Sequence, residues 1–327
     1  MPWVRAWSDD DVSKHVDNLH LAVVNKHPRD AAVAFREEDH VYFVKVGDTW
    51  LKLKTSVSGV YSRFFEHFDD RNAAASVARK RKTDRNSPYY WLIQSCSDVH
   101  DEDAVAKVVR EAWKMTGERA SRLGTLCHLA MEMYANNVAS KQIEDADARV
   151  DVDDVYATPL VLAAKGWLDA RMKEGWHPYR TEWSIFGLFC HNEMQNELEN
   201  DFENDFENEY VKRHDSIVAG QTDLLLRHDD GRFWLVDYKF CGSKKLDKEL
   251  GPFGKWGLDP LKEVPDNSYG HYLAQQSIYS FILKRRYDVR VSRSSLLHVP
   301  TDETPVRPRL LDLELLPDDV VLQMLVA

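Results

Sequence analysis

The chain has 327 residues, with 43 Lys and Arg against 54 Asp and Glu, and a net charge of −11. Its 43% hydrophobic and 30% charged residues are typical of a folded protein and exclude a disordered chain. No apolar run approaches the roughly 18 residues that a membrane helix needs, and the polar N-terminus does not resemble a signal peptide. The four scattered cysteines show no disulfide or zinc spacing, so we expect an intracellular protein, cytoplasmic or nuclear, or in a host cell if viral, that is neither secreted nor bound to a membrane.

The first part of the chain, residues 1–118, predicts a hairpin followed by helices. Residues 41–54 alternate between apolar and polar around Gly47-Asp48, the pattern of two strands joined by a tight turn. Ser and Thr residues at 55–58 are suited to cap a helix that begins there. The segments 101–116 and 119–139 each show helical periodicity, so we expect two further helices.

A basic segment lies at 78–91, ARKRKTDRNSPYYW, where four cations follow one another and three aromatic residues come soon after. The four cations are Arg79, Lys80, Arg81 and Lys82. Cations that bind phosphates, with flat rings that stack on bases, form the surface that a single-strand binding protein needs. A plain surface loop and a nuclear-localisation-like cluster are the two alternatives.

The second part, residues 119–327, changes from helices to strands. Thr158-Pro159 is typical of a helix start, and this helix should run to about residue 174. Strand patterns follow at 179–189, 216–227 and 232–240, then a helix at 271–287, a strand at 289–299 and a short helix from about 317. This order predicts an α/β fold with a mixed central sheet flanked by helices.

An acidic repeat occupies 192–210, NEMQNELENDFENDFENEY, with eight acids and no Lys or Arg. Phe202, Phe206 and Tyr210 recur at helical spacing. The segment is either a docking helix for a basic protein partner, or a DNA mimic, or a solvated insertion whose aromatic stripe packs on the body.

The most informative stretch is 217–240, where two apolar strands flank His-Asp-Asp-Gly. A three-residue loop ending at Gly231 would place Asp223 directly opposite Asp237. Two facing carboxylates need a proton or a cation between them, and oxygen ligands suit Mg²⁺. Asp237 and Lys239 share a strand face because side chains alternate. A one-residue slip of the register would undo this arrangement.

Asp223 followed by Asp237-Tyr238-Lys239 resembles the motif of the PD-(D/E)XK nuclease superfamily, in particular its RecB-like exonuclease branch. That branch also carries G-T-x-x-H on a helix, an acid on the preceding strand and a later Q-x-x-x-Y helix. In this chain Gly124…His128, Glu182 and Gln275…Tyr279 match these elements in order. The layout is similar to viral, phage and mitochondrial-maintenance-type exonucleases. It departs from the pattern in the acidic insertion and in lacking the four cluster cysteines of some relatives.

The resemblance implies a restriction-endonuclease-like core and a set of roles. His128, Asp223, Asp237 and the Tyr238 carbonyl would bind Mg²⁺, or Mn²⁺ as a substitute, and no iron–sulfur cluster is expected. Glu182 would lie near the metal, and Lys239 would orient water or stabilise the charge that develops. Gln275 and Tyr279 would hold a phosphate or base, with Tyr272 and Gln276 beside them. Lys244, after the catalytic strand, is either a phosphate contact or a solvated lysine.

We therefore predict a metal-dependent exonuclease that acts on DNA which is single-stranded or has a free end, in replication, recombination or repair. The region 1–118 would form one wall of the DNA channel. An endonuclease for flaps, branched DNA or RNA on the same core is the enzymatic alternative. A non-catalytic interaction module that uses the acidic repeat is the alternative of another class.

Overall fold

The computed structural model describes residues 19–81, 84–96, 98–137, 158–189, 217–246 and 254–327. By their internal contacts the residues form two compact units, one of 1–66 with 127–327 and one of 67–126. The acidic repeat at 192–210 lies outside the described residues, as does Lys82. None of the described helices is both long enough and apolar enough to cross a membrane.

A five-stranded mixed sheet forms the centre of the larger unit, in the order β4-β5-β6-β7-β8. Its strands are β4 (Trp176–Leu188), β5 (Ile217–His228), β6 (Phe233–Cys241), β7 (Val291–Pro300) and β8 (Arg309–Asp312). Neighbours pair antiparallel except β6 and β7, which are parallel and are joined through a helix. This confirms the predicted α/β fold with a mixed sheet. Strand β8 in the tail was not predicted.

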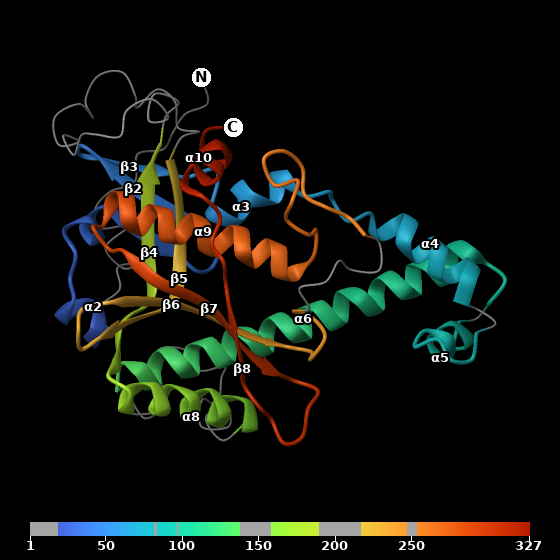
Figure 1. Cartoon of the computed structure of the whole chain (residues 1–327). Helices are drawn as coiled ribbons and strands as arrows, with labels where there is room; N and C mark the ends of the chain where they lie inside the picture. The colour runs from blue at the N-terminus through green and yellow to red at the C-terminus, as the bar shows by residue number, and fades with distance from the viewer. Residues whose placement is uncertain (1–18, 82–83, 97, 138–157, 190–216, 247–253) are drawn as a thin grey trace. The chain divides into compact units, whose positions relative to one another are not determined.

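Helices cover both faces of this sheet (Figure 1). Helix α9 (Ser268–Arg286) lies along one face, with contacts to β4 and β7, and α8 (Pro159–Lys173) contacts the same two strands from the other face. The short helices α3 (Val57–Tyr61) and α10 (Asp318–Val326) pack against α9. Because both faces are covered, the central strands are nearly continuous apolar runs, and their few charged residues lie in an apolar environment.

A second, three-stranded antiparallel sheet comes from the N-terminal part of this unit. It consists of β1 (Val33–Arg36), β2 (Val41–Val46) and β3 (Thr49–Lys52). The predicted hairpin is confirmed, with Gly47 in the left-handed conformation that the turn requires (φ +57°). Val44 and Leu51 of this sheet pack on Phe186 and Ala219 of β4 and β5. Ser56 then caps α3 by accepting the backbone N–H of Gly59, as its position predicts.

The smaller unit, 67–126, differs from the sequence prediction in its longest helix. The two helices expected at 101–116 and 119–139 are one continuous helix, α6 (Glu102–Ala135), which ends a few residues before the predicted boundary. A single glycine, Gly117, costs only about 1 kcal/mol in a helix and does not interrupt it. Most of the basic segment's cations lie at the end of a helix, α4 (Asp70–Arg81), and not in a loop, and α5 (Tyr90–Gln94) follows.

A buried ion pair attaches the N-terminal segment of the larger unit to β4. Arg180 is 2% exposed, and its guanidinium donates to Oδ2 of Asp30 at 2.7 Å. Asp30, in the 3-10 helix η1 (Pro28–Ala32), also accepts Nε1 of Trp183 at 2.8 Å and the backbone N–H of His27. A buried guanidinium needs such an anionic partner because desolvation of an unpaired charge is costly.

Replacing Asp30 by Ala should therefore lower the free energy of unfolding by about 3–5 kcal/mol, since it leaves a buried cation without its carboxylate. Urea unfolding followed by circular dichroism measures this. Asp39→Ala is the matched control, because Asp39 pairs with Arg36 at 43% exposure and its loss should change the stability much less. Equal losses for both variants would contradict the buried-pair account.

Candidate metal and catalytic site

The hairpin of β5 and β6 has the predicted register. Its loop is Asp229–Gly231: the His228 N–H donates to the carbonyl of Arg232 at 2.8 Å, and Gly231 has φ +91°. Leu224 pairs with Val236, so the next residues, Asp223 and Asp237, lie opposite each other as the loop length predicts. At that step the Asp223 carboxylate itself accepts the backbone N–H of Tyr238 at 2.8 Å. The Asp223 side chain therefore replaces the backbone carbonyl that would otherwise accept this N–H from the neighbouring strand.

The β4–β5 register adds a third acid to this row. Thr181 pairs with Leu224 and Trp183 with Thr222, which places Glu182 between them and opposite Asp223. Glu182 has φ +41°, a left-handed conformation that is rare for a residue with a side chain. Gln221 donates to its carbonyl at 2.8 Å and supports this local turn of the strand. Backbone strain of this kind is concentrated at functional sites.

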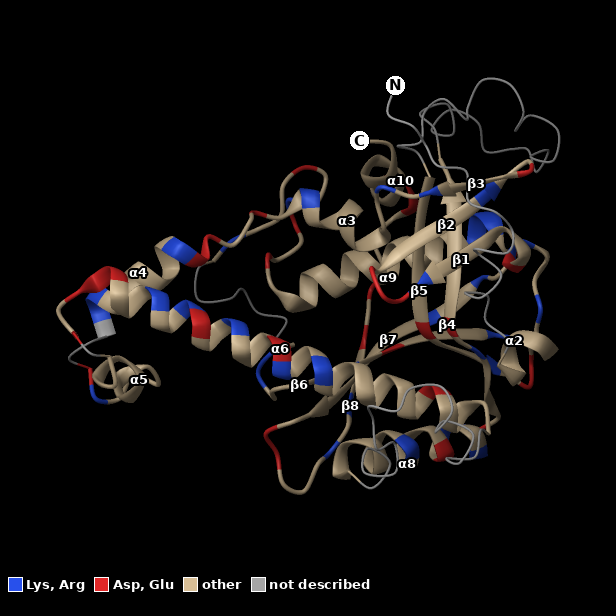
Figure 2. Ribbon diagram, turned by 180° about the vertical axis from the view of Figure 1, so that it is seen from behind, with Lys and Arg blue, Asp and Glu red and all other residues tan. Residues whose placement is uncertain are grey.

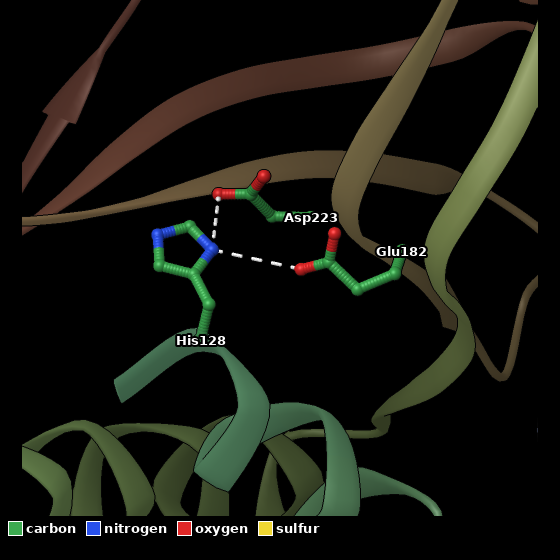
Figure 3. Close-up of side chains that lie close together, drawn as sticks. All are labelled: His128, Glu182 and Asp223. Carbon is green, nitrogen blue, oxygen red and sulfur yellow. Dashed lines mark ion pairs between the residues drawn. The ribbon is translucent and has the colours of Figure 1, made fainter. Parts of the chain in front are cut away.

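His128, on α6, brings an imidazole against two of these acids (Figure 3). Its Nδ1 lies 3.5 Å from Oε1 of Glu182 and 3.4 Å from Oδ2 of Asp223, and its Nε2 lies 3.1 Å from the Tyr238 carbonyl oxygen. Burial alone would lower the pKa of His128, but the carboxylates of Asp223 and Glu182 raise it to about 9. For the carboxyl group of Glu182, burial has the opposite effect and raises the pKa.

The donor set fits a hard divalent cation. One potential ligand atom from each of His128, Glu182 and Asp223 lies within 4.8 Å of the others, and the Tyr238 carbonyl oxygen lies 3.1 Å from the second ring nitrogen of His128. Oxygen-rich sites of this type suit Mg²⁺ and Mn²⁺. Partly buried carboxylates that face one another need a neutralising charge, which a divalent ion supplies. The residues are therefore suited to a hard divalent metal.

Asp237 and Lys239 lie next to this group on β6. Asp237 is 2% exposed and its Oδ2 forms an ion pair with the Lys239 ammonium. Burial, and to a lesser degree Asp223, raises the pKa of Asp237 to about 6, against the lowering effect of Lys239. Burial lowers the pKa of Lys239, but Asp237 and Asp223 raise it overall. That Asp237 is itself a metal ligand stays a prediction.

Two contacts from α9 reach the same pair. Gln276, fully buried, donates its Nε2 to Oδ1 of Asp237 at 3.0 Å. The Lys239 ammonium lies 4.3 Å from the centre of the Tyr272 ring. The Q-x-x-x-Y resemblance gives this helix's role to Gln275 and Tyr279, whereas the contacts to Asp237 and Lys239 come from Gln276 and Tyr272. The sequence carries a signal for these contacts: Tyr272 and Gln276 are one helical turn apart, which matches the two-residue spacing of Asp237 and Lys239 on the strand.

The structure places the remaining predicted residues elsewhere. Gln275 donates to the Tyr279 hydroxyl at 3.3 Å, and Tyr279 is 4% exposed and packs against Gly220, where a Cβ would lie 2.6 Å from its ring. Lys244 is exposed in the turn after β6. Arg79 and Lys80 are exposed on α4, and the Arg81 side chain is not described. Nucleic-acid contacts by these residues stay predictions.

A model of the PD-(D/E)XK nuclease superfamily matches residues 90–319, and the chain therefore belongs to this superfamily. This confirms the resemblance at the level of the superfamily. Among solved structures the chain is similar to one titled "Crystal structure of SSO0001", with 14% identity and a TM-score of 0.25. That match covers 57% of this chain and 66% of the other, just under two thirds. No curated protein matches the chain.

We expect Mn²⁺ to raise the melting temperature of the wild-type protein and to raise that of Asp223→Asn much less. A ligand that binds only the folded state stabilises it by about 2.7 kcal/mol at 100 times its Kd. Asp223→Asn removes a carboxylate from the group and should retain the wild-type melting temperature without metal. Asp229→Asn, in the exposed loop of the same hairpin, is the control and should respond as the wild type does. If Mn²⁺ raised the melting temperature of Asp223→Asn as much as that of the wild type, Asp223 would not be a metal ligand.

Proposed function

We propose that this protein is a divalent-metal-dependent exonuclease of the RecB-like branch that hydrolyses phosphodiester bonds of DNA at single-stranded or free ends. Membership of the PD-(D/E)XK superfamily implies a metal-dependent nuclease. The observation that supports the proposal most is the row of three acids across β4, β5 and β6, with His128 on one side and Lys239 on the other.

The acids of the row and Lys239 have different tasks in this proposal. Glu182, Asp223, Asp237, His128 and the Tyr238 carbonyl would hold Mg²⁺ or Mn²⁺. The bound metal would supply a polarised phosphoryl oxygen and a water of lowered pKa. Lys239, 15% exposed and bordered by a carboxylate and an aromatic ring, is a preorganised cation beside the reacting group. Its ammonium would orient the attacking water and stabilise the negative charge that develops on the phosphate.

The smaller unit supports the choice of a nucleic acid substrate. Residues 67–126 contain eleven Lys and Arg against nine Asp and Glu, whereas the whole chain has a net charge of −11. In Figure 2 the basic residues of α4 and α6 alternate with acidic ones along the helices. Trp91 on α5 is 78% exposed, a ring available for stacking on a base.

Labelled single-stranded DNA in linear and circular forms tests the proposal. We expect Mg²⁺ or Mn²⁺ to support digestion of the linear strand to short products, EDTA to abolish it, and the circle to survive. Ca²⁺ should support binding with little cleavage, because it tolerates irregular coordination. Lys239→Ala should cleave about 10²–10³-fold more slowly while it still binds Mn²⁺. Cleavage of the circle would indicate an endonuclease, and robust cleavage in EDTA would contradict the proposal.

The basic segment gives an independent prediction for DNA affinity. Arg79→Ala with Lys80→Ala should weaken single-strand binding and reduce the slope of log affinity against log salt by about 1.4, since each lost phosphate contact contributes about 0.7. Fluorescence anisotropy at several salt concentrations in Ca²⁺ measures the slope. Lys284→Ala with Arg285→Ala, an exposed Lys-Arg pair in the last turn of α9, is the charge-matched control. If both double variants change the slope equally, the segment has no specific role.

A further inference from the structure

We propose that Gln276 and Tyr272 are a pair of positioning residues on α9, in which Gln276 orients the Asp237 carboxylate for the metal and Tyr272 holds the Lys239 ammonium beside it. This inference rests on the proposed function of the site. It assigns a role to two side chains outside the G-T-x-x-H, acid, D-x-K and Q-x-x-x-Y positions. Neither residue would itself contact the metal or the substrate.

The geometry of the two elements explains why they engage as a pair. Tyr272 and Gln276 are four residues apart on a helix, a rise of about 6 Å. Lys239 and Asp237 are two residues apart on a strand, a rise of about 6.6 Å. Tyr272 contacts Lys239, and Gln276 contacts Asp237. One turn of the helix therefore spans the same length as two strand residues, with the helix and the strand running in opposite directions. A shift of α9 by one residue would break both contacts together.

The Gln276 amide fixes one oxygen of Asp237, and the Lys239 ammonium contacts the other. Its Nε2 donates to Oδ1, while Oδ2 faces Lys239. An ionised carboxylate can only accept, which requires the amide to present its NH₂ group and not its carbonyl. Because Asp237 is 2% exposed, water has little access to the carboxylate and the protein contacts set its orientation.

The other end of the Gln276 amide carries a folding cost that an apolar residue at this position would not carry. Its Oε1 is buried without a hydrogen-bond partner among the described residues. An unsatisfied buried carbonyl costs free energy of folding, and such atoms are rare in native proteins. An apolar side chain of the same size would avoid that cost but could not orient Asp237.

Helix α9 is fixed at several points, so it can hold Tyr272 and Gln276 in place at the site. Asn267 caps its N-terminus by accepting the Gly270 N–H at 2.9 Å. Gly270 itself packs against the backbone of Pro265, where a Cβ would lie 1.9 Å from the carbonyl oxygen. Further along, the Ser277 hydroxyl accepts the backbone N–H of Leu316 at 3.0 Å. Tyr272 and Gln276 lie between these attachments.

The test is Mn²⁺ titration calorimetry on the whole chain without DNA. Gln276→Met retains the volume and removes the amide, and it should weaken Mn²⁺ binding about 10–100-fold, the usual effect of losing a partner that orients a metal ligand. Gln275→Met changes the same residue type at the next position, where the amide contacts Tyr279 and not Asp237. It should bind Mn²⁺ as the wild type does. Metal-free melting curves establish that each variant is folded.

Tyr272 is tested by separating binding from turnover. At saturating Mn²⁺, Tyr272→Leu should lower kcat roughly 2- to 30-fold, the range of a cation–π contact, with Mn²⁺ affinity unchanged. Tyr272→Phe retains the ring and should restore the rate. A purely structural role would instead lower stability in both Tyr272 variants and would give no rescue by Phe.

The outcomes are distinguishable. Wild-type Mn²⁺ affinity in Gln276→Met, or an equal loss in Gln275→Met, overturns the role of Gln276. Failure of Phe to rescue Tyr272→Leu overturns the role of Tyr272. If the wild type binds Mn²⁺ but does not cleave DNA, the proposed function fails, while the titrations still decide the role of Gln276. If the wild type binds no Mn²⁺, both proposals fall.

Discussion

Mutual repulsion among three carboxylates in an apolar sheet is the constraint on which the structure of this site depends. Glu182, Asp223 and Asp237 occupy one row across three adjacent strands whose flanking residues are buried. Ionised acids in such a place are unstable unless positive charge and hydrogen-bond donors surround them. Several elements provide these groups: α6 contributes His128, β6 contributes Lys239 and the Tyr238 N–H, and α9 contributes Gln276.

This arrangement separates two kinds of positive charge. His128 lies on the Glu182–Asp223 side of the row, where the carboxylates are 22% and 13% exposed. Lys239 lies on the Asp237 side, where burial is nearly complete. A metal that enters would approach from the more accessible side and would meet the imidazole and the Tyr238 carbonyl there. The buried lysine would remain where the phosphate charge develops. In the proposed function, the more accessible end of the row would admit the metal, which Asp237 would help to hold, and Lys239 would stabilise charge beside it.

Much of this row could be predicted from sequence because it depends on local rules. Gly231 in a three-residue loop sets the register of β5 and β6, and strand alternation then places Asp223 opposite Asp237 and on the face of Lys239. The left-handed conformation of Glu182 and the contacts of Gln276 depend on tertiary packing, which local pattern does not contain. The continuity of α6 was missed for a related reason: Gly117 lowers helix propensity, but its neighbours favour the helix strongly enough to continue it.

The most direct test of the central claim is diffraction from crystals grown with Mn²⁺ and measured at the manganese absorption edge. The account predicts one or more anomalous peaks within coordination distance of Asp223, with Glu182 or Asp237 and the Tyr238 carbonyl among the ligands. Lys239 should lie beside the peak and not be displaced into solvent. Manganese bound away from the row, with the Glu182, Asp223 and Asp237 side chains unchanged around His128 and Lys239, would contradict it.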